Sequence, residues 1–226
     1  KVFCADMVSR LNRFIAKHFH PAANGVYMYI AIYGKIGSGK SSVMELLRKR
    51  GKRTCSCDEI YKNVVVNSPE YIEAIDKNFP GAVKDGEIDL ARLAEIVYGD
   101  KVKLAKLDSI AHPQIRACLR RILDGFPEAY AEVPLLVESN WQDMFDKCVY
   151  VKADSALRAE RVKERDGKTE EQVALVDSHR MNDAVLELNA DYIIENNGTL
   201  ADLAAAVDDM LAALKSDGKK EGKNAK

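Results

Sequence analysis

The sequence Gly34-Lys35-Ile36-Gly37-Ser38-Gly39-Lys40-Ser41 matches the pattern G-x-x-x-x-G-K-[ST] at every fixed position. Its glycines allow backbone dihedrals that a side chain would forbid, so successive N–H groups can face one anion. We expect Lys40 to reach the β- and γ-phosphates of a nucleotide and Ser41 to place its hydroxyl on Mg²⁺. The dipole of the helix that begins here would favour the same phosphates. The residues predicted to bind the nucleotide are Gly34, Lys35, Ile36, Gly37, Ser38, Gly39, Lys40, Ser41 and Ser42.

The segments on either side of this loop help to distinguish a phosphate site from a glycine-rich turn that binds nothing. Residues 29–33 form an apolar run that predicts a short buried strand. Residues 42–50 have the apolar spacing of an amphipathic helix. Because a strand, a glycine-rich loop and a helix follow one another in the order that the pattern requires, we favour the phosphate site and an α/β fold.

Length and composition set limits on the class of protein. A chain of 226 residues most simply makes one α/β domain with an inserted or appended subdomain. The net charge of −1 gives no general bias toward nucleic acid or an anionic membrane, and we expect neither partner. No run of eighteen apolar residues occurs, so no transmembrane helix is expected. The scattered, odd-numbered cysteines suggest reduced thiols in a cytoplasmic enzyme, with Cys55 and Cys57 as buried strand residues.

An acidic residue follows the second predicted strand. Residues 52–57 are expected to form that strand, and Asp58 to open the next helix. Ligands of doubly wound sheets bind at the carboxyl ends of the strands, so Asp58 can face the γ-phosphate. Aspartate is also a favourable helix N-cap, and the two roles are compatible.

The middle of the chain has a helical pattern, which predicts a helical subdomain over about residues 60–125. Pro80-Gly81 and Asp85-Gly86 mark turns. Pro113 is expected to end one helix and begin another. Taken alone, His112 beside it would be a surface or core histidine.

The last part of the chain adds strands at 128–133, 147–151 and 191–195 and a closing helix at 200–214. Arg161 and Arg165 lie four residues apart on a predicted helix, so they share a face. They are either a solvated pair with Glu160 and Glu164 as partners or lid arginines that stabilise a transferring phosphoryl group. Residues 169–189 would return the chain from this lid.

The two ends of the chain are expected to lie outside this domain. Residues 1–27 precede the first core strand and have the apolar spacing of one short helix, so we interpret them as an N-terminal extension. Residues 215–226 are polar, basic and glycine-bearing, and are expected to be disordered.

With these motifs in order, residues 28–212 resemble the dephospho-CoA kinase family. The resemblance rests on the ordered set rather than on one motif. Its parts are the phosphate loop, Asp58 to Ile60, Asp85-Gly86-Glu87-Ile88-Asp89, His112-Pro113 with Ile115, Val133-Pro134-Leu135-Leu136 with Glu138, Arg161 with Arg165-Asp166, and Ala190-Asp191-Tyr192-Ile193-Ile194 before Asn196.

The resemblance implies Mg²⁺- and ATP-dependent phosphorylation of the ribose 3′-hydroxyl of dephospho-CoA, which gives coenzyme A and ADP as the last step of coenzyme A synthesis. It implies a P-loop three-layer αβα fold with a five-stranded parallel sheet, a helical CoA-binding subdomain and a lid at about 155–189, all within residues 28–214. The chain would be a monomer or a small homo-oligomer. Matched by motif, the general base would be Asp58, the lid residues Arg161 and Arg165, the acceptor-side residues His112, Pro134, Leu135 and Glu138, and the residue near the adenine Asn196.

Four positions differ from the usual family pattern and bear on acceptor affinity or lid closure. They are Ser56 in place of an acid, Leu90 in place of arginine, Val137 in place of phenylalanine and Arg180 in place of glutamine. Two other functions stay open. One is a small-molecule P-loop kinase for a nucleoside, nucleotide or shikimate-like alcohol. The other is a non-catalytic nucleotide-binding regulator, which is disfavoured because Asp58 and both lid arginines are present.

Overall fold

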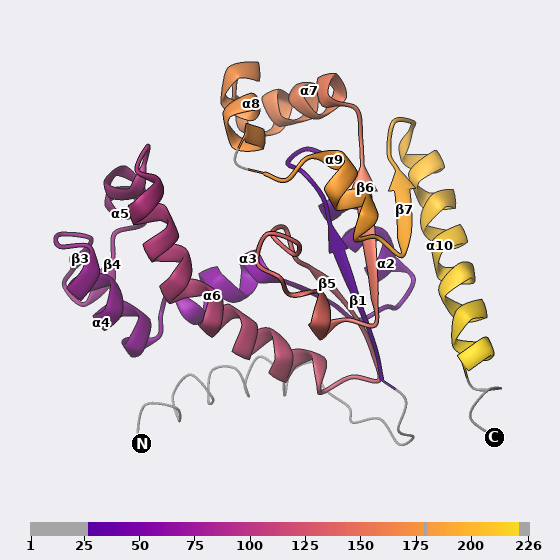
Figure 1. The fold of residues 1–226 in the computed structure, drawn as a ribbon, viewed down its shortest axis with the longest axis horizontal. Helices are drawn as coiled ribbons and strands as arrows, with labels where there is room; N and C mark the ends of the chain where they lie inside the picture. Colours follow the sequence, from indigo (N-terminus) through magenta and orange to yellow (C-terminus); the bar gives the residue numbers. More distant parts are fainter. Residues whose placement is uncertain (1–26, 179, 222–226) are drawn as a thin grey trace. The chain divides into compact units, whose positions relative to one another are not determined.

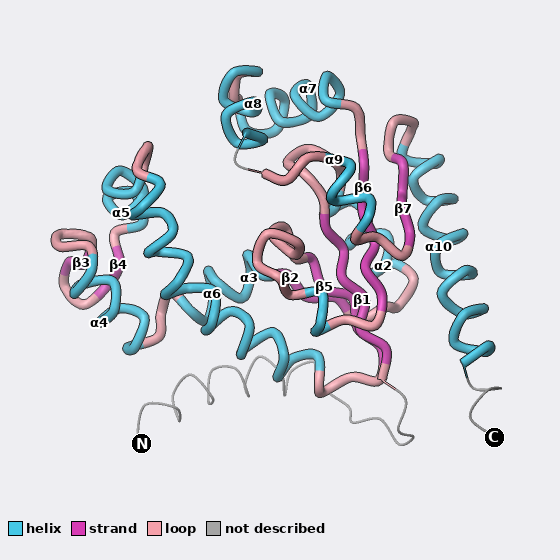
Figure 2. Tube along the Cα trace, viewed as in Figure 1, coloured by secondary structure: helices cyan, strands magenta, loops and turns pink. Residues whose placement is uncertain are grey.

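Five parallel strands form the sheet that carries the phosphate loop, as Figure 2 shows in magenta. The computed structural model describes residues 27–178 and 180–221. The strand order is β2-β5-β1-β6-β7, with β1 in the centre between β5 and β6. This confirms the predicted five-stranded parallel sheet. The strands are β1 (Met28–Tyr33), β2 (Thr54–Ser56), β5 (Glu128–Glu132), β6 (Lys147–Lys152) and β7 (Tyr192–Glu195).

The chain divides into two units at β2. The sheet unit comprises Met28–Thr54 and the residues from Glu128 onward, and the helical unit comprises Cys55–Pro127. In the sheet unit, Ile32 of β1 pairs with Glu132 of β5 and with Val149 of β6. This parallel register brings the carboxyl ends of β1, β5 and β6 to one edge of the sheet, where the loop begins.

Helices cover both faces of the sheet, as the three-layer fold requires (Figure 1). Alternate residues of β1 point to opposite faces. Ile30 and Ile32 pack with buried apolar residues of α2 (Lys40–Lys49) and α10 (Leu200–Glu221). On the other face, the hydroxyl of Tyr33 donates to the carbonyl of Leu186 at 2.6 Å, in α9 (Asp183–Leu188). The loop therefore starts from a strand that is buried on both sides.

Two helices follow the carboxyl end of β6, in the segment that was predicted to form a lid. They are α7 (Ser155–Asp166) and α8 (Glu170–Ser178). Gly167 ends α7 in the left-handed conformation, with φ of 67°. The expected return of the chain at 169–189 consists of two separate helices, α8 and α9. A short 3₁₀ helix, η2 (Gln142–Met144), precedes β6.

The helical unit is built from helices and one small hairpin. Its hairpin turns at Asp85-Gly86, where both residues have positive φ, of 52° and 81°. This turn confirms the predicted one. The elements of the unit are α3 (Cys57–Ile60), the π-helix η1 (Tyr61–Val65), α4 (Pro69–Asn78), β3 (Val83–Lys84), β4 (Glu87–Ile88), α5 (Leu90–Val97) and α6 (Lys101–Leu123).

The prediction that Pro113 ends a helix was wrong, because α6 continues through it from Lys101 to Leu123. A proline inside a helix removes one hydrogen bond and costs about 3 kcal/mol. On both sides of it, α6 buries apolar residues, including Ala111, Ile115 and Leu119. Each large apolar side chain contributes roughly 1.5–3 kcal/mol when fully buried, so packing outweighs the lost bond.

Two further boundaries differ from the sequence prediction. Cys57 is buried as predicted but begins α3 rather than ending a strand. The backbone of α10 continues to Glu221, beyond the predicted end at Leu214. Leu214 is buried and is the last apolar residue in the sequence of that helix, so the apolar pattern stopped before the helix did.

Three sequence interpretations lie outside the described residues. They concern the helix in residues 1–26, Cys4, and disorder in residues 222–226. Of the described cysteines, Cys55, Cys57, Cys118 and Cys148 are buried and none is in a disulfide bond. Across residues 27–178 and 180–221, no helix combines the length and the apolar character needed to cross a membrane.

Candidate active site

The phosphate loop has the backbone that its glycines predict. Gly34, Gly37 and Gly39 have φ of 151°, 76° and 97°, which side chains rarely adopt. Packing imposes a second requirement. A Cβ on Gly37 would lie 2.5 Å from the carbonyl oxygen of Arg158, and one on Gly39 would overlap the amide nitrogen of Asn196. The loop is therefore closed against α7 and the end of β7 at two of its glycines.

Side chains from outside the loop hold two of its carbonyl groups. Asn196 donates from Nδ2 to the carbonyl of Ser38 at 2.8 Å, and Arg158 donates from Nη1 to the carbonyl of Ile36 at 3.1 Å. The C=O and N–H of a trans peptide point in opposite directions. The next N–H groups, those of Gly37 and Gly39, are thus each directed away from the side chain that holds the preceding carbonyl, and we expect an anion to accept hydrogen bonds from them.

Lys40 lies within the loop and is buried, with 9% of its surface exposed. Its Nζ donates to the carbonyls of Gly34 and Lys35 at 2.9 Å each. The helix that follows begins at Lys40 with Gly39 as its N-cap, has no capping side chain and has no acid in its first turn. Ser42 lies exposed in this turn. Positive charge and uncapped N–H groups therefore meet at one point, which fits an anion.

The other loop lysine has a different partner. The Nζ of Lys35 lies 3.0 Å from Oδ1 of Asp183 in α9, and the hydroxyl of Tyr150 donates to the same oxygen at 2.7 Å. Burial raises the pKa of Asp183, but the hydrogen bonds from Tyr150 and Lys35 outweigh it and hold that pKa below its usual value. Lys35 thus anchors the loop to α9.

An acid that the sequence analysis did not select lies beside Ser41. The Ser41 hydroxyl donates to Oε1 of Glu132, the last residue of β5, at 3.4 Å. Within the described residues, no group of three or more His, Cys, Asp or Glu side chains could hold a metal by itself. Mg²⁺ at phosphates keeps waters and takes only one or two protein oxygens, so this pair fits it. The signal in the sequence that could have identified Glu132 was an acid at the end of an apolar strand.

The two arginines that were predicted to belong to a lid, Arg161 and Arg165, have different surroundings. Nη2 of Arg161 donates to the backbone carbonyl of Asn196 at 3.0 Å, while its Nη1 is buried with no hydrogen-bond partner among the described residues. A buried unpaired donor of a charged group is unfavourable by more than roughly 1–3 kcal/mol, and an anionic oxygen would satisfy it. Arg165 is exposed and binds Asp166 through two hydrogen bonds of 2.8 and 2.7 Å. That hydrogen-bonded carboxylate raises the pKa of Arg165.

The predicted acceptor motif follows β5 in the sheet unit. Arg180 joins two of its residues: Nη1 donates to the carbonyl of Pro134 at 3.2 Å and lies 3.7 Å from Oε1 of Glu138. Leu135, between them, is half-buried. The residue that differs from the usual family pattern therefore contacts the motif directly. Val137, another such residue, is buried within it.

The remaining two candidates, Asp58 and His112, lie in the helical unit. Asp58 is exposed in the first turn of α3, and the N-cap position belongs to Ser56. The capping role proposed for Asp58 was therefore wrong. His112 lies on α6, with Nε2 3.7 Å from Oδ1 of Asp108. Burial raises the pKa of Asp108, and the His112 charge acts in the opposite direction.

The structure thus brings together one part of the predicted site. The loop, Arg161, Asn196 and the Pro134 motif all belong to the sheet unit, and Asp58 and His112 belong to the helical unit. Asn196 was expected near an adenine. Its side chain is 95% buried and supports the loop at Ser38, and the adenine contact stays a prediction.

Comparison with known proteins gives the same assignment as these residues. The family model for dephospho-CoA kinase matches residues 28–202. A dephospho-CoA kinase of Thermus thermophilus is 33% identical over 187 residues, which cover 82% of this chain and 91% of that protein.

Solved structures agree in fold. The crystal structure of TT1252 from Thermus thermophilus has a TM-score of 0.73 and 32% identity, covering 84% of this chain and 99% of that one. Shikimate kinase from Acinetobacter baumannii, in complex with shikimate, has a TM-score of 0.50 at 14% identity, covers 84% and 94%, and shares the fold alone. Since the family model and the curated relative both span most of the chain, it belongs to the dephospho-CoA kinase family.

Proposed function

We propose that this kinase transfers the γ-phosphoryl group of ATP to the ribose 3′-hydroxyl of dephospho-CoA, giving coenzyme A and ADP. The observation that carries the ATP site is the loop, in which Arg158 and Asn196 hold two carbonyls while Lys40 and the start of α2 supply positive charge. The acceptor follows from the relatives' name and from the motif at Pro134 to Glu138.

The sheet unit's own residues bind and neutralise the phosphates. Lys40 and the N–H groups at the start of α2 would contact the β- and γ-phosphates. The buried Nη1 of Arg161, which has no hydrogen-bond partner among the described residues, would donate to a phosphate oxygen. Ser41 and Glu132 would hold Mg²⁺, which neutralises phosphate charge when bound. These groups act by position and charge, which is most of what phosphoryl transfer needs.

The helical unit supplies the proposed base. The carboxylate of Asp58 would take the proton of the 3′-hydroxyl as the ribose oxygen bonds to the γ-phosphorus and the bond to the ADP oxygen breaks. Its exposed position in the first turn of α3 leaves the carboxylate accessible to a substrate. His112, Pro134, Leu135 and Glu138 would contact the acceptor.

Arg161→Ala and Arg165→Ala are expected to lower the turnover number more than they weaken ATP binding. Each guanidinium would act mainly when the lid closes over the transferring group. Lysine should rescue poorly because it lacks the two-pronged geometry of arginine. Steady-state kinetics and ATP titration of both variants would measure this. Lys163→Ala, exposed on the same helix, is the matched control. Unchanged turnover in both arginine variants would mean that neither guanidinium acts on the transferring group.

The fold does not identify the acceptor, because shikimate kinase has a similar fold. The deciding experiment measures ADP release with Mg-ATP in the presence of dephospho-CoA, adenosine, nucleoside monophosphates or shikimate. We expect dephospho-CoA to be strongly preferred. Preference for another alcohol would identify a different small-molecule kinase. ATP binding without ADP release, with any acceptor, would favour the non-catalytic regulator.

We also propose that residues 28–214 are the kinase domain. The family match begins at residue 28, and the buried residues of α10 extend to Leu214. A chain that begins at Met28 should keep its activity, which the same ADP-release measurement would show.

We further propose a monomer or small homo-oligomer that acts in the cytoplasm without nucleic acid or membrane, and sedimentation would measure its size.

A further inference from the structure

Arg158 is a buried arginine on α7 that is not among the groups proposed above to contact the phosphates. It lies on α7 and only 4% of it is exposed. Its three guanidinium nitrogens have acceptors on three different segments. Nε donates to the carbonyl of Ala153 at 3.2 Å, Nη1 to that of Ile36 at 3.1 Å, and Nη2 to Oδ2 of Asp177 on α8 at 2.6 Å.

One of these acceptors belongs to the phosphate loop. Because the Ile36 carbonyl faces Arg158, the N–H of Gly37 in the same trans peptide faces the other way. Gly37 has a φ of 76°. Because glycine adopts positive and negative φ about equally well, the residue itself does not fix the orientation of the peptide, and contacts must fix it. Arg158 supplies a charged hydrogen bond for this purpose, which is stronger than a neutral one.

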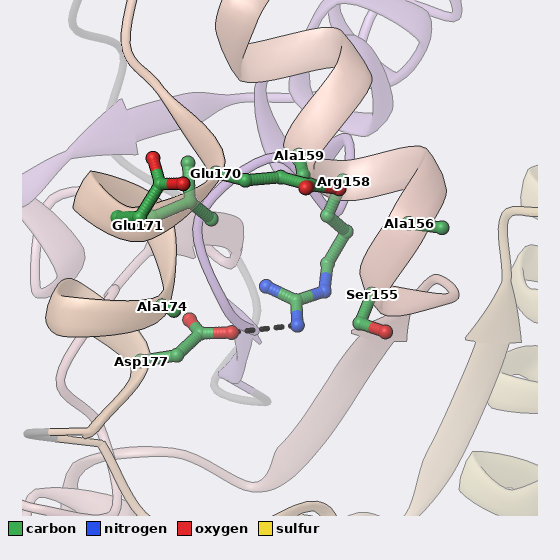
Figure 3. A pocket seen from close by; sticks show the side chains of 9 residues that line it. Ser155, Ala156, Arg158, Ala159, Glu170, Glu171, Ala174 and Asp177 are labelled. Atoms are coloured by element: carbon green, nitrogen blue, oxygen red, sulfur yellow. Dashed lines mark hydrogen bonds and ion pairs between the residues drawn. The ribbon is translucent and has the colours of Figure 1, made fainter.

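The third acceptor connects the loop to the second lid helix. Ala159 and Val162 of α7 pack with Val173 of α8, and Ile36 packs against the same cluster. In Figure 3 the guanidinium of Arg158 points across the space between the two helices to Asp177. A pocket of about 540 Å³ opens beside this pair. The loop, α7 and α8 therefore share one apolar contact, and Arg158 is hydrogen-bonded to the loop and ion-paired to α8.

We propose that Arg158 is a positioning residue for ATP. It holds the Ile36–Gly37 peptide in the orientation that presents the Gly37 N–H to the phosphates, and Asp177 holds Arg158 in place. The position of α8 and the shape of the phosphate loop are thereby coupled. This inference rests on the proposed use of the loop for ATP.

The test uses Arg158→Lys in the full chain. Arg158→Ala would leave Asp177 buried without its partner and risks unfolding the lid. Lysine keeps the charge beside Asp177 but cannot reach all three acceptors, since its ammonium is a single point. We expect the Kd for Mg-ATP, measured without acceptor, to rise roughly 10-fold or more, as loss of one charged hydrogen bond implies. Melting temperature and dephospho-CoA affinity should stay near wild type.

A second readout separates positioning from general destabilisation. Amide hydrogen exchange across residues 34–41 should become faster in Arg158→Lys, while exchange in the strands is unchanged. Lys163→Ala, exposed on the same helix, should match wild type in both measurements. Unchanged ATP affinity in folded Arg158→Lys would overturn the proposal, as would an affinity loss that only follows a loss of melting temperature.

A second variant tests the role of Asp177, and it still tests the coupling if Arg158→Lys does not fold. Asp177→Asn keeps the size of the side chain and removes its charge, so ATP affinity should fall in the same direction but less. The two changes together should not add, because both act on one peptide. Glu171→Gln, an exposed acid on the same helix beside the same pocket, is the control. Wild-type affinity in Asp177→Asn would overturn the coupling. Wild-type protein that fails to bind Mg-ATP would instead overturn the proposed function.

Discussion

Lys40→Ala is expected to lower the turnover number by about 10²- to 10³-fold or more while the protein stays folded. The γ-phosphoryl group carries spread negative charge in a largely dissociative transition state, and we propose that the Lys40 ammonium stabilises that charge. The substitution also removes the hydrogen bonds from Nζ to the carbonyls of Gly34 and Lys35. Turnover with Mg-ATP and dephospho-CoA, together with circular dichroism, would measure both effects.

The matched control for this prediction is Lys49→Ala. Lys49 lies on the same helix, is exposed, and has a long ion pair of 4.0 Å with Glu45. Exposed pairs of this kind contribute about 0–1 kcal/mol, so the variant should behave like wild type. Near-normal turnover in a folded Lys40→Ala protein would remove the loop lysine from the mechanism.

The parts of the fold that were predicted correctly depend on local patterns. The strand that ends at Tyr33 and the helix that begins at Lys40 have apolar residues at the periods of their own structures. The phosphate loop could be recognised from the fixed spacing of its glycines, because Gly37 and Gly39 have positive φ, which other residues rarely adopt. Such features can be recognised without knowing what packs against them.

The errors arise where packing or helix propensity overrides a local signal. Pro113 normally ends a helix, and nothing in the neighbouring sequence shows that Ala111 and Ile115 would be buried strongly enough to carry α6 through it. Aspartate is a favoured N-cap residue, so Asp58 was a plausible helix cap. Ser56 takes that position instead, because the strand ends earlier than predicted. Boundaries of this kind depend on where the sheet stops.

The residues missed in the site are those whose role depends on a distant partner. Arg158 is one basic residue in a basic helix, and no pattern indicates that it would reach Ile36 and Asp177. Glu132 gave a weak signal, as an acid at the end of a buried strand, and its proximity to Ser41 depends on the parallel register of β1 and β5. Site residues that lie at fixed spacing in one motif could be predicted, whereas site residues that packing brings together from distant segments could not.

Asp58→Asn tests the base and is expected to slow turnover by about 10²- to 10⁴-fold. Asparagine keeps the size of the side chain and removes its basicity, so the 3′-hydroxyl proton has no acceptor at that position. Because Ser56 rather than Asp58 is the N-cap of α3, the substitution should leave the helix start intact. The effect should lie toward the low end of this range if bond breaking to the leaving phosphate precedes proton transfer.

The control for this prediction is Glu59→Gln, the next residue in the same turn of α3 and also exposed. Neighbouring residues of a helix do not share a face, so Glu59 should point elsewhere and its change should be mild. Mg-ATP affinity should stay within a few-fold in both variants, since Lys40 and Ser41 lie in the sheet unit and are unchanged. The measurement is turnover at saturating dephospho-CoA with an ATP titration. A near-normal Asp58→Asn enzyme with an inactive Glu59→Gln enzyme would move the base by one residue, and two near-normal enzymes would remove it from this turn.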